Sequence, residues 1–124
     1  MDKKKILVVD DSKIMREVLT IFLLRELEDF DIEVTTAADG WTALDAIFTD
    51  TFDVVLTDNS MPGMTGSELV VAACDRGCTM PIIMVTGDEE WQIPHIARSL
   101  LNAVVQKPID IAELGALVRK ALSA

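Results

Sequence analysis

Short apolar segments alternate with longer amphipathic stretches along the whole chain. Four segments consist almost entirely of apolar residues, 6–9, 54–57, 82–85 and 103–105, and residues 32–35 form a weaker, β-branched fifth. Apolar runs without polar alternation are typical of strands that are covered on both faces, as in a parallel sheet between two helical layers. The sequence therefore predicts five parallel strands.

Each predicted strand is followed by a stretch with helical periodicity. In the first, Ser12 is placed as an N-cap, and the apolar stripe of an amphipathic helix consists of Ile14, Val18, Ile21 and Phe22. Three further helices carry start signals: the Asp39-Gly40 break before the second, the Thr65 and Glu68 capping box of the third, and Asp110 with Glu113 in the fifth.

The fourth helix is constrained by Pro94, because proline lacks the amide proton that a helix interior needs and fits best in the first turn. We place its start near Ile93, which leaves residues 87–92 as a loop. The order is then a strand followed by a helix, five times over. It predicts one domain over residues 1–124, an α/β three-layer, doubly wound (βα)5 flavodoxin-like fold with a five-stranded parallel sheet in the order 2-1-3-4-5.

The net negative charge of the chain disfavours negatively charged partners. Eleven Lys and Arg against twenty-one Asp and Glu give a net charge of −10, which repels nucleic acids and anionic lipids. We interpret the basic residues 3–5 as solvated charge at a chain end rather than a nucleic-acid patch. No apolar run reaches the ~20 residues that cross a bilayer, and the start does not fit a signal peptide. We therefore expect a cytosolic (cytoplasmic) protein without membrane or direct nucleic-acid binding.

Cysteine and histidine indicate no second site. Cys74 and Cys78 lack the further Cys or His pair of a zinc site, and His95 has no catalytic partner near it in sequence. We expect two idle or buried thiols and a surface or partly packed histidine.

Polar residues stand where four of the predicted strands end. Asp10 and Asp11 follow the first strand, Asp58 the third, Thr86 the fourth and Lys107 the fifth. In open sheets of this kind, ligands bind beyond the carboxyl ends of the strands, near the point where the strand order reverses. Taken singly, the acids fit helix caps or turns, and Thr86 and Lys107 fit ordinary strand ends. Their convergence on one edge favours a shared site.

Three carboxylates at one edge repel one another unless a cation lies between them. Oxygen ligands favour Mg²⁺, which commonly takes one or two carboxylates and leaves room for a phosphate oxygen. An Asp carboxylate can also act as a nucleophile and form an aspartyl-phosphate. We therefore predict Mg²⁺ at Asp10, Asp11 and Asp58, a phosphoryl group on Asp58, and contacts from Thr86 and Lys107 to its oxygens.

Taken together, the motifs resemble the receiver domain of bacterial response regulators (CheY-like), the phosphoacceptor half of two-component signalling. The resemblance runs nearly end to end and is carried by Ile-Leu-Val-Val-Asp10-Asp11-Ser, Ala-Asp-Gly40, Asp53-Val-Val-Leu-Thr-Asp58, Met61-Pro62-Gly63-Met-Thr-Gly66, Pro81-Ile-Ile-Met-Val-Thr86 and Lys107-Pro108.

The resemblance implies a role for each site residue. It makes Asp58 the phosphoacceptor and Asp11 a direct Mg²⁺ ligand, with Asp10 acting mainly through water and the Ser60 backbone carbonyl as a third protein ligand. Thr86 and Lys107 become the pair that senses the phosphoryl group. By the same resemblance, Ser60 and Asp88 tune the lifetime of that group.

The resemblance also implies partners. The donor is a phosphohistidine on a sensor histidine kinase or a histidine phosphotransfer protein of a phosphorelay. The surface formed by helix 4, strand 5 and helix 5 then acts on a downstream protein or an output domain. The chain is accordingly expected to be a signalling phosphoacceptor and not an enzyme.

Several positions depart from the family pattern. An aromatic residue is usual three positions before the lysine, but Val104 stands there, the usual Gly-Ala pair is Leu100-Leu101, and Gly87 follows Thr86. We predict that residues 87–92 and helix 4 carry the readout in place of an aromatic rotamer, with Trp91 as its reporter. The alternative is that Trp91 simply packs over helix 4.

Two other classes remain open from sequence. A phosphatase-like hydrolase would need a second Asp two residues after Asp10, where Ser12 stands, and turnover of a phosphomonoester would favour it. A pseudo-receiver would bind a partner without phosphorylation, and a lack of Mg²⁺-dependent labelling would favour that class.

Overall fold

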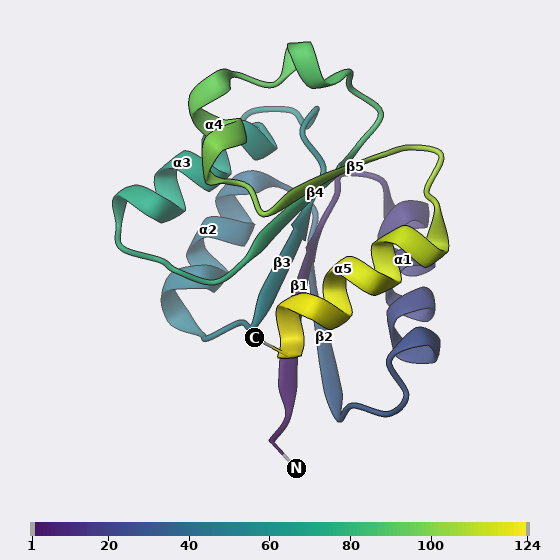
Figure 1. Cartoon of the computed structure of the whole chain (residues 1–124). Coiled ribbons are helices and arrows are strands. Elements are labelled where there is room, and N and C mark those ends of the chain that lie inside the picture. Colours follow the sequence, from purple (N-terminus) through teal and green to yellow (C-terminus); the bar gives the residue numbers. More distant parts are fainter. Residues whose placement is uncertain (1, 124) are drawn as a thin grey trace.

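Five parallel strands and five α-helices alternate along the chain in the computed structural model, which describes residues 2–123 (Figure 1). The strands are β1 (Lys4–Val9), β2 (Ile32–Ala37), β3 (Val54–Thr57), β4 (Ile82–Thr86) and β5 (Ala103–Gln106). The helices are α1 (Lys13–Glu26), α2 (Gly40–Thr49), α3 (Gly66–Asp75), α4 (His95–Leu100) and α5 (Ile111–Ser123), with a 3-10 turn, η1 (Glu90–Gln92), before α4.

The strand order is β2-β1-β3-β4-β5, which confirms the predicted topology. The register decides which residues meet beyond the strands. Val9 pairs with Thr57, so Asp10 and Asp58 leave adjacent strands at the same level. Thr86 pairs with Gln106 in the same way, so Lys107 follows β5 directly beside the end of β4.

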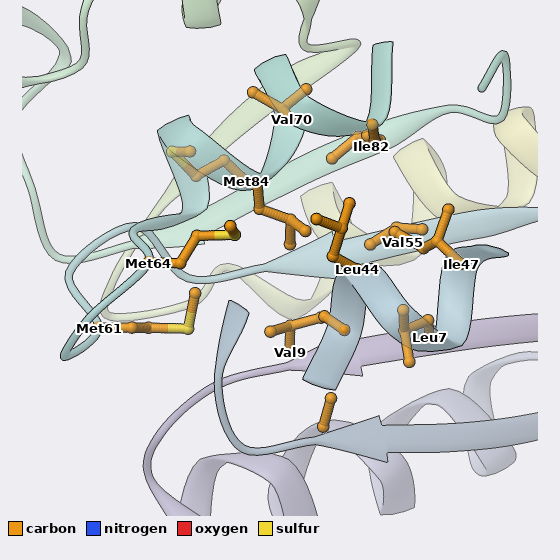
Figure 2. Close-up of a cluster of buried hydrophobic side chains, with 14 of the residues drawn as sticks. Leu7, Val9, Leu44, Ile47, Val55, Met61, Met64, Val70, Ile82 and Met84 are labelled. Atoms are coloured by element: carbon orange, nitrogen blue, oxygen red, sulfur yellow. The ribbon is translucent and has the colours of Figure 1, made fainter. Parts of the chain in front are cut away.

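Helices cover both faces of the sheet, with α1 and α5 on one side and α2, α3 and α4 on the other (Figure 1). The alternation of side chains along β1 supplies both layers. Ile6 and Val8 join the buried cluster beneath α1 and α5. Leu7 and Val9 join the opposite cluster, which Figure 2 shows filled from α2 by Leu44 and from the neighbouring strands β3 and β4. The uninterrupted apolar runs of the sequence are explained by this double burial.

The predicted helix starts are confirmed where the sequence carries a cap. The Ser12 and Asp39 side chains accept from Met15 N and Thr42 N. Thr65 and Glu68 form a complete capping box at the start of α3. The same helix ends at Asp75, and Gly77 follows its C-cap Arg76 with a φ of +85°, a left-handed conformation that favours glycine.

Two details of the helices differ from expectation. The stripe assigned to α1 is wrong for three residues, because Ile14, Val18 and Ile21 are 72%, 49% and 55% exposed. Leu19 and Leu23 are the buried residues of this helix, so the face that packs on the sheet is rotated from the predicted one. Helix α4 begins at His95, two residues later than predicted, with Pro94 as its N-cap and Ile93 buried ahead of it.

The remaining expectations concern single residues and membranes. Cys74 and Cys78 are free and partly buried, and His95 is exposed at the start of α4. Within residues 2–123, every helix is too short or too polar to cross a lipid bilayer.

Candidate functional site

Three carboxylates meet at the carboxyl edge of the sheet. Asp10 follows β1 and Asp58 follows β3, and the two residues are only 1% and 8% exposed, whereas Asp11 is exposed. One oxygen from each of the three can be chosen so that all lie within 4.8 Å of one another. The sheet register therefore gathers the predicted acidic trio.

Lys107 is the cation that holds the two buried acids. Its Nζ donates to Asp10 Oδ2 at 3.1 Å and to Asp58 Oδ2 at 3.2 Å. Partial burial acts to lower the pKa of Lys107, but hydrogen bonds and charge attraction from Asp10 and Asp58 outweigh it, so the pKa lies above its ordinary value. The lysine is therefore a fixed positive charge between the two carboxylates.

Backbone amides orient the other carboxylate oxygens. Asn59 N donates to Asp58 Oδ1 at 2.7 Å, and Ser12 N donates to Asp10 Oδ1 at 2.9 Å. The Arg16 guanidinium donates to the Asp10 carbonyl at 2.8 Å and braces the loop after β1. Sequence reasoning missed Arg16, because nothing in its spacing from Asp10 marks it as a contact to a backbone oxygen.

The loop after β3 is held close to the start of α3. Gly66 N donates to the Asn59 carbonyl at 2.9 Å, and a Cβ at Gly66 would lie 2.0 Å from the Asp58 carbonyl oxygen. Met61 and Met64 are buried and point from this loop into the core beside Val9 (Figure 2). Glycine and two apolar anchors thus fix the backbone that carries Asp58.

Thr86 and Ser60 contact a residue beyond the acidic trio. Thr86 is fully buried at the end of β4, and its hydroxyl accepts from Asp88 N at 3.1 Å. The Ser60 hydroxyl donates to Asp88 Oδ2 at 2.7 Å, and Asn59 Nδ2 donates to the same oxygen at 2.8 Å. Asn59 is buried and was missed from sequence, although a polar residue directly after a strand-ending acid was a usable signal. The role of the Ser60 carbonyl as a metal ligand stays a prediction.

The segment after Thr86 lies beside an open groove of about 790 Å³. Glu89, His95 and Gln106 are among its lining residues. Val104 packs against the cluster that contains Ile93 and Ala97, so a small side chain occupies the position where an aromatic ring was the family expectation. Trp91 also lines the groove and is 82% exposed, which contradicts the idea that it packs over α4.

The donor set fits a hard divalent cation. All three acidic side chains offer oxygen, and Lys107 supplies only one positive charge against their three negative charges. Mg²⁺ commonly uses one or two carboxylates and keeps its other positions for water or phosphate oxygens. Asp10, Asp11 and Asp58 are therefore able to hold such an ion.

Comparisons with known proteins agree with this geometry. The sequence profile described as the response regulator receiver domain matches residues 6–119. The chain is 38% identical over 119 residues to the chemotaxis protein CheY of Pseudomonas aeruginosa, with 94% of each chain covered.

Solved structures of response regulators share this fold. The response regulator protein TrrA of Thermotoga maritima, in complex with Mg²⁺-BeF, matches with a TM-score of 0.82 and 31% identity, covering 96% of this chain and 99% of that one. A CheY-like response regulator receiver domain protein from Methanospirillum hungatei matches with a TM-score of 0.84 and 27% identity, covering 98% and 95%. This chain therefore belongs to the response regulator receiver domain family of two-component signalling.

Proposed function

We propose that this chain accepts a phosphoryl group on Asp58 as the receiver of a two-component system or phosphorelay. The observation that carries the proposal is the setting of the Asp58 carboxylate. It is buried, its two oxygens are oriented by Lys107 and by Asn59 N, and it lies within metal-binding distance of Asp10 and Asp11. A nucleophile held in one orientation beside positive charge suits phosphoryl transfer, which depends mainly on positioning and charge neutralisation.

The transfer exchanges one bond for another. An Asp58 carboxylate oxygen forms the new bond to phosphorus, and the bond from phosphorus to the imidazole nitrogen of the donor breaks. That nitrogen leaves with the electron pair of the broken bond. Lys107 neutralises charge beside the nucleophile, and the Thr86 hydroxyl, which now accepts from Asp88 N, keeps its own proton to donate to a phosphoryl oxygen.

A divalent cation completes the site in this proposal. Asp10, Asp11, Asp58 and the Ser60 backbone carbonyl would hold Mg²⁺, which supplies the positive charge that lets an anion approach three carboxylates. The complex of the Thermotoga relative with Mg²⁺-BeF supports this choice of ion.

The partners follow from the chemistry and from the family. The donor is a phosphohistidine of a sensor histidine kinase or of a histidine phosphotransfer protein, met in the cytoplasm. The receiver passes the signal to a downstream protein or an output domain through the α4, β5 and α5 side. The chain then acts as a phosphoacceptor whose own phosphoryl group is lost slowly, rather than as an enzyme that turns over a substrate.

Mass spectrometry after treatment with a small acyl phosphate and Mg²⁺ tests the proposal. We expect a gain of one phosphoryl group in the parent chain and none in Asp58→Asn. Asp45→Asn is the matched control, because Asp45 is exposed on α2, away from the site, and it should be modified as the parent is. An adduct that survives Asp58→Asn would move the acceptor elsewhere. A parent chain that stays unmodified would favour an interaction module that works without phosphorylation.

A further inference from the structure

Asp88 is bound at each of its three polar groups. Its amide donates to Thr86 Oγ1 at 3.1 Å, and its carbonyl accepts from Gln106 Nε2 at 2.8 Å. Its carboxylate accepts from Asn59 Nδ2 and Ser60 Oγ at 2.8 and 2.7 Å. One loop residue thereby joins the ends of β3, β4 and β5.

Asn59 extends this connection to α3. Its side-chain oxygen accepts from Ser67 N at 3.0 Å and from Ser67 Oγ at 2.6 Å, while its amide nitrogen donates to Asp88. Its backbone N–H donates to Asp58 Oδ1. Asn59 is buried and uses both ends of its side chain, so neither end can turn away without leaving a polar atom unpaired. It is a rigid anchor between the phosphoacceptor and Asp88.

We propose that Asp88 is a positioning residue that holds the Thr86 hydroxyl, and that a phosphoryl group on Asp58 releases it. The release step rests on the phosphoryl transfer proposed above. We call Asp88 with its anchors Asn59, Ser60 and Gln106 the Asp88 latch.

Electrostatics gives the reason for release. The donors to the Asp88 carboxylate are the neutral side chains of Asn59 and Ser60, so among residues 2–123 its bonding partners carry no positive charge that would offset further negative charge. A phosphoryl group on Asp58 adds negative charge one residue away from the Asn59 anchor. It also offers the Thr86 hydroxyl proton a charged acceptor, and we propose that the hydroxyl moves toward that acceptor and away from Asp88 N. Both effects weaken the Asp88 bonds.

The latch connects directly to the surface. Gln106, which holds the Asp88 carbonyl, also lines the groove, and so does Glu89, the residue after Asp88. Opening the latch therefore changes the wall of the groove without a moving aromatic ring at residue 104. The change in the groove wall would then take the place of the moving aromatic side chain that is usual at the position of Val104.

Hydrogen exchange of the Asp88 amide, measured by NMR on the unmodified full chain, reads the latch directly. Gln106→Met keeps side-chain length but removes the donor to the Asp88 carbonyl, and we expect the Asp88 amide to exchange roughly fivefold faster. Gln92→Met is the matched control. Gln92 Oε1 accepts from Glu89 N within the same loop and does not contact Asp88 N, so the loss of this bond should leave exchange of the Asp88 amide unchanged. Ser60→Ala, which removes a different anchor, should again give roughly fivefold faster exchange.

The rate of adduct formation on Asp58 tests release. A variant that weakens the latch shifts the chain toward the state that the phosphoryl group favours, so Gln106→Met should be modified roughly fivefold faster than Gln92→Met. Equal Asp88 exchange in the parent, Gln106→Met and Ser60→Ala would overturn the positioning role. Faster exchange with equal rates of modification would overturn release. A parent without any adduct would overturn the phosphoryl function and release together, while the exchange comparison would still decide the positioning role alone.

Discussion

Two charge clusters lie at opposite ends of β1, and they are built differently. At the amino end, Lys5 Nζ pairs with Asp50 and lies 3.9 Å from Glu33, while Asp53 accepts from Lys5 N at 2.8 Å. The side chains of Asp50 and Glu33 are 46% and 51% exposed. The sequence suggested solvated charge for residues 3–5, but Lys5 is paired rather than free in solvent. The carboxylates around its ammonium group are about half exposed.

At the carboxyl end one lysine again stands against three carboxylates, but two of these are buried. The side chains of Asp10 and Asp58 are 2% and 10% exposed, they share Lys107, and Asp11 adds a third negative charge. Exposed pairs contribute little to stability, whereas buried charge without full compensation is costly. The comparison teaches that the end of the sheet that carries the candidate site is the end where the fold tolerates electrostatic repulsion.

The largest expected effect comes from closing the space behind Asp58. In Gly66→Ala the added Cβ would lie 2.0 Å from the Asp58 carbonyl oxygen, so the loop or α3 must shift. We expect a loss of about 3 kcal/mol in the free energy of unfolding, measured by urea denaturation. Gly87→Ala is the control, because a Cβ at Gly87 meets no atom within 4 Å. Equal stability of the two variants would show that this end of the sheet is less tightly built than its contacts indicate.

Removing each lysine in turn compares the two clusters directly. Lys107→Met leaves two buried carboxylates facing each other, and we expect a loss of about 2 kcal/mol in chelator-treated buffer, where partial exposure moderates the effect. Lys5→Met at the amino end should cost less than about 1 kcal/mol. Added Mg²⁺ should recover stability in Lys107→Met and not in Lys5→Met. Similar losses in both variants, measured by urea denaturation, would remove the distinction between the clusters.

Relieving repulsion should have the opposite sign. Asp11 is exposed, and Asp11→Asn lowers the charge of the trio while leaving Asp10 and Asp58 bound to Lys107. We expect about 1 kcal/mol of added stability without metal, because like charges in a partly hydrated site repel moderately. Thermal unfolding in chelator and in Mg²⁺ checks this, since the variant should also lose most of its stabilisation by Mg²⁺. Asp45→Asn should change neither measurement. A less stable Asp11→Asn chain in chelator would contradict the repulsion.

The sequence predicted what depends on chain order and strand ends. Apolar runs predicted the strands of the sheet. Because parallel strands end at one edge, the clustering of Asp10, Asp11 and Asp58 followed from the predicted strand order. Periodicity was less informative for α1, where Leu19 and Leu23 compete with an equally regular stripe of exposed residues. Which stripe is buried depends on how the helix is rotated against the sheet, and that is a tertiary property.

Contacts made by backbone atoms were the hardest part to predict. The bonds of Asp88 to Thr86 and Gln106 use its amide and carbonyl, which no side-chain pattern encodes. The close approach of Gly66 to the Asp58 carbonyl likewise depends on the path of the loop. The sequence shows which residue types are present, but which atoms they contact depends on the path of the folded backbone.

The smallest expected effect is the pH dependence of the amino-end pair. The hydrogen bond from Lys5 is the main cause that lowers the pKa of Asp50 below its ordinary 3.8. A carboxyl whose pKa is lower in the folded chain stabilises it above the unfolded pKa, and this contribution is lost as the pH falls through the folded value. The melting temperature of Asp50→Asn should therefore lie slightly below that of the parent at neutral pH.

As the pH falls below 3.8 and through the lower pKa of Asp50 in the folded chain, that difference should shrink toward zero, because the parent carboxyl then becomes protonated and loses its charge. Thermal unfolding followed by circular dichroism across this range checks the trend. A difference that grows in acid would mean that Asp50 destabilises the ionised fold, and the amino end would then share the repulsion of the carboxyl end. A small difference that fades in acid identifies Asp50 and Lys5 as a locally neutralised pair, which leaves the Asp58 end as the part of the sheet where buried carboxylates repel one another.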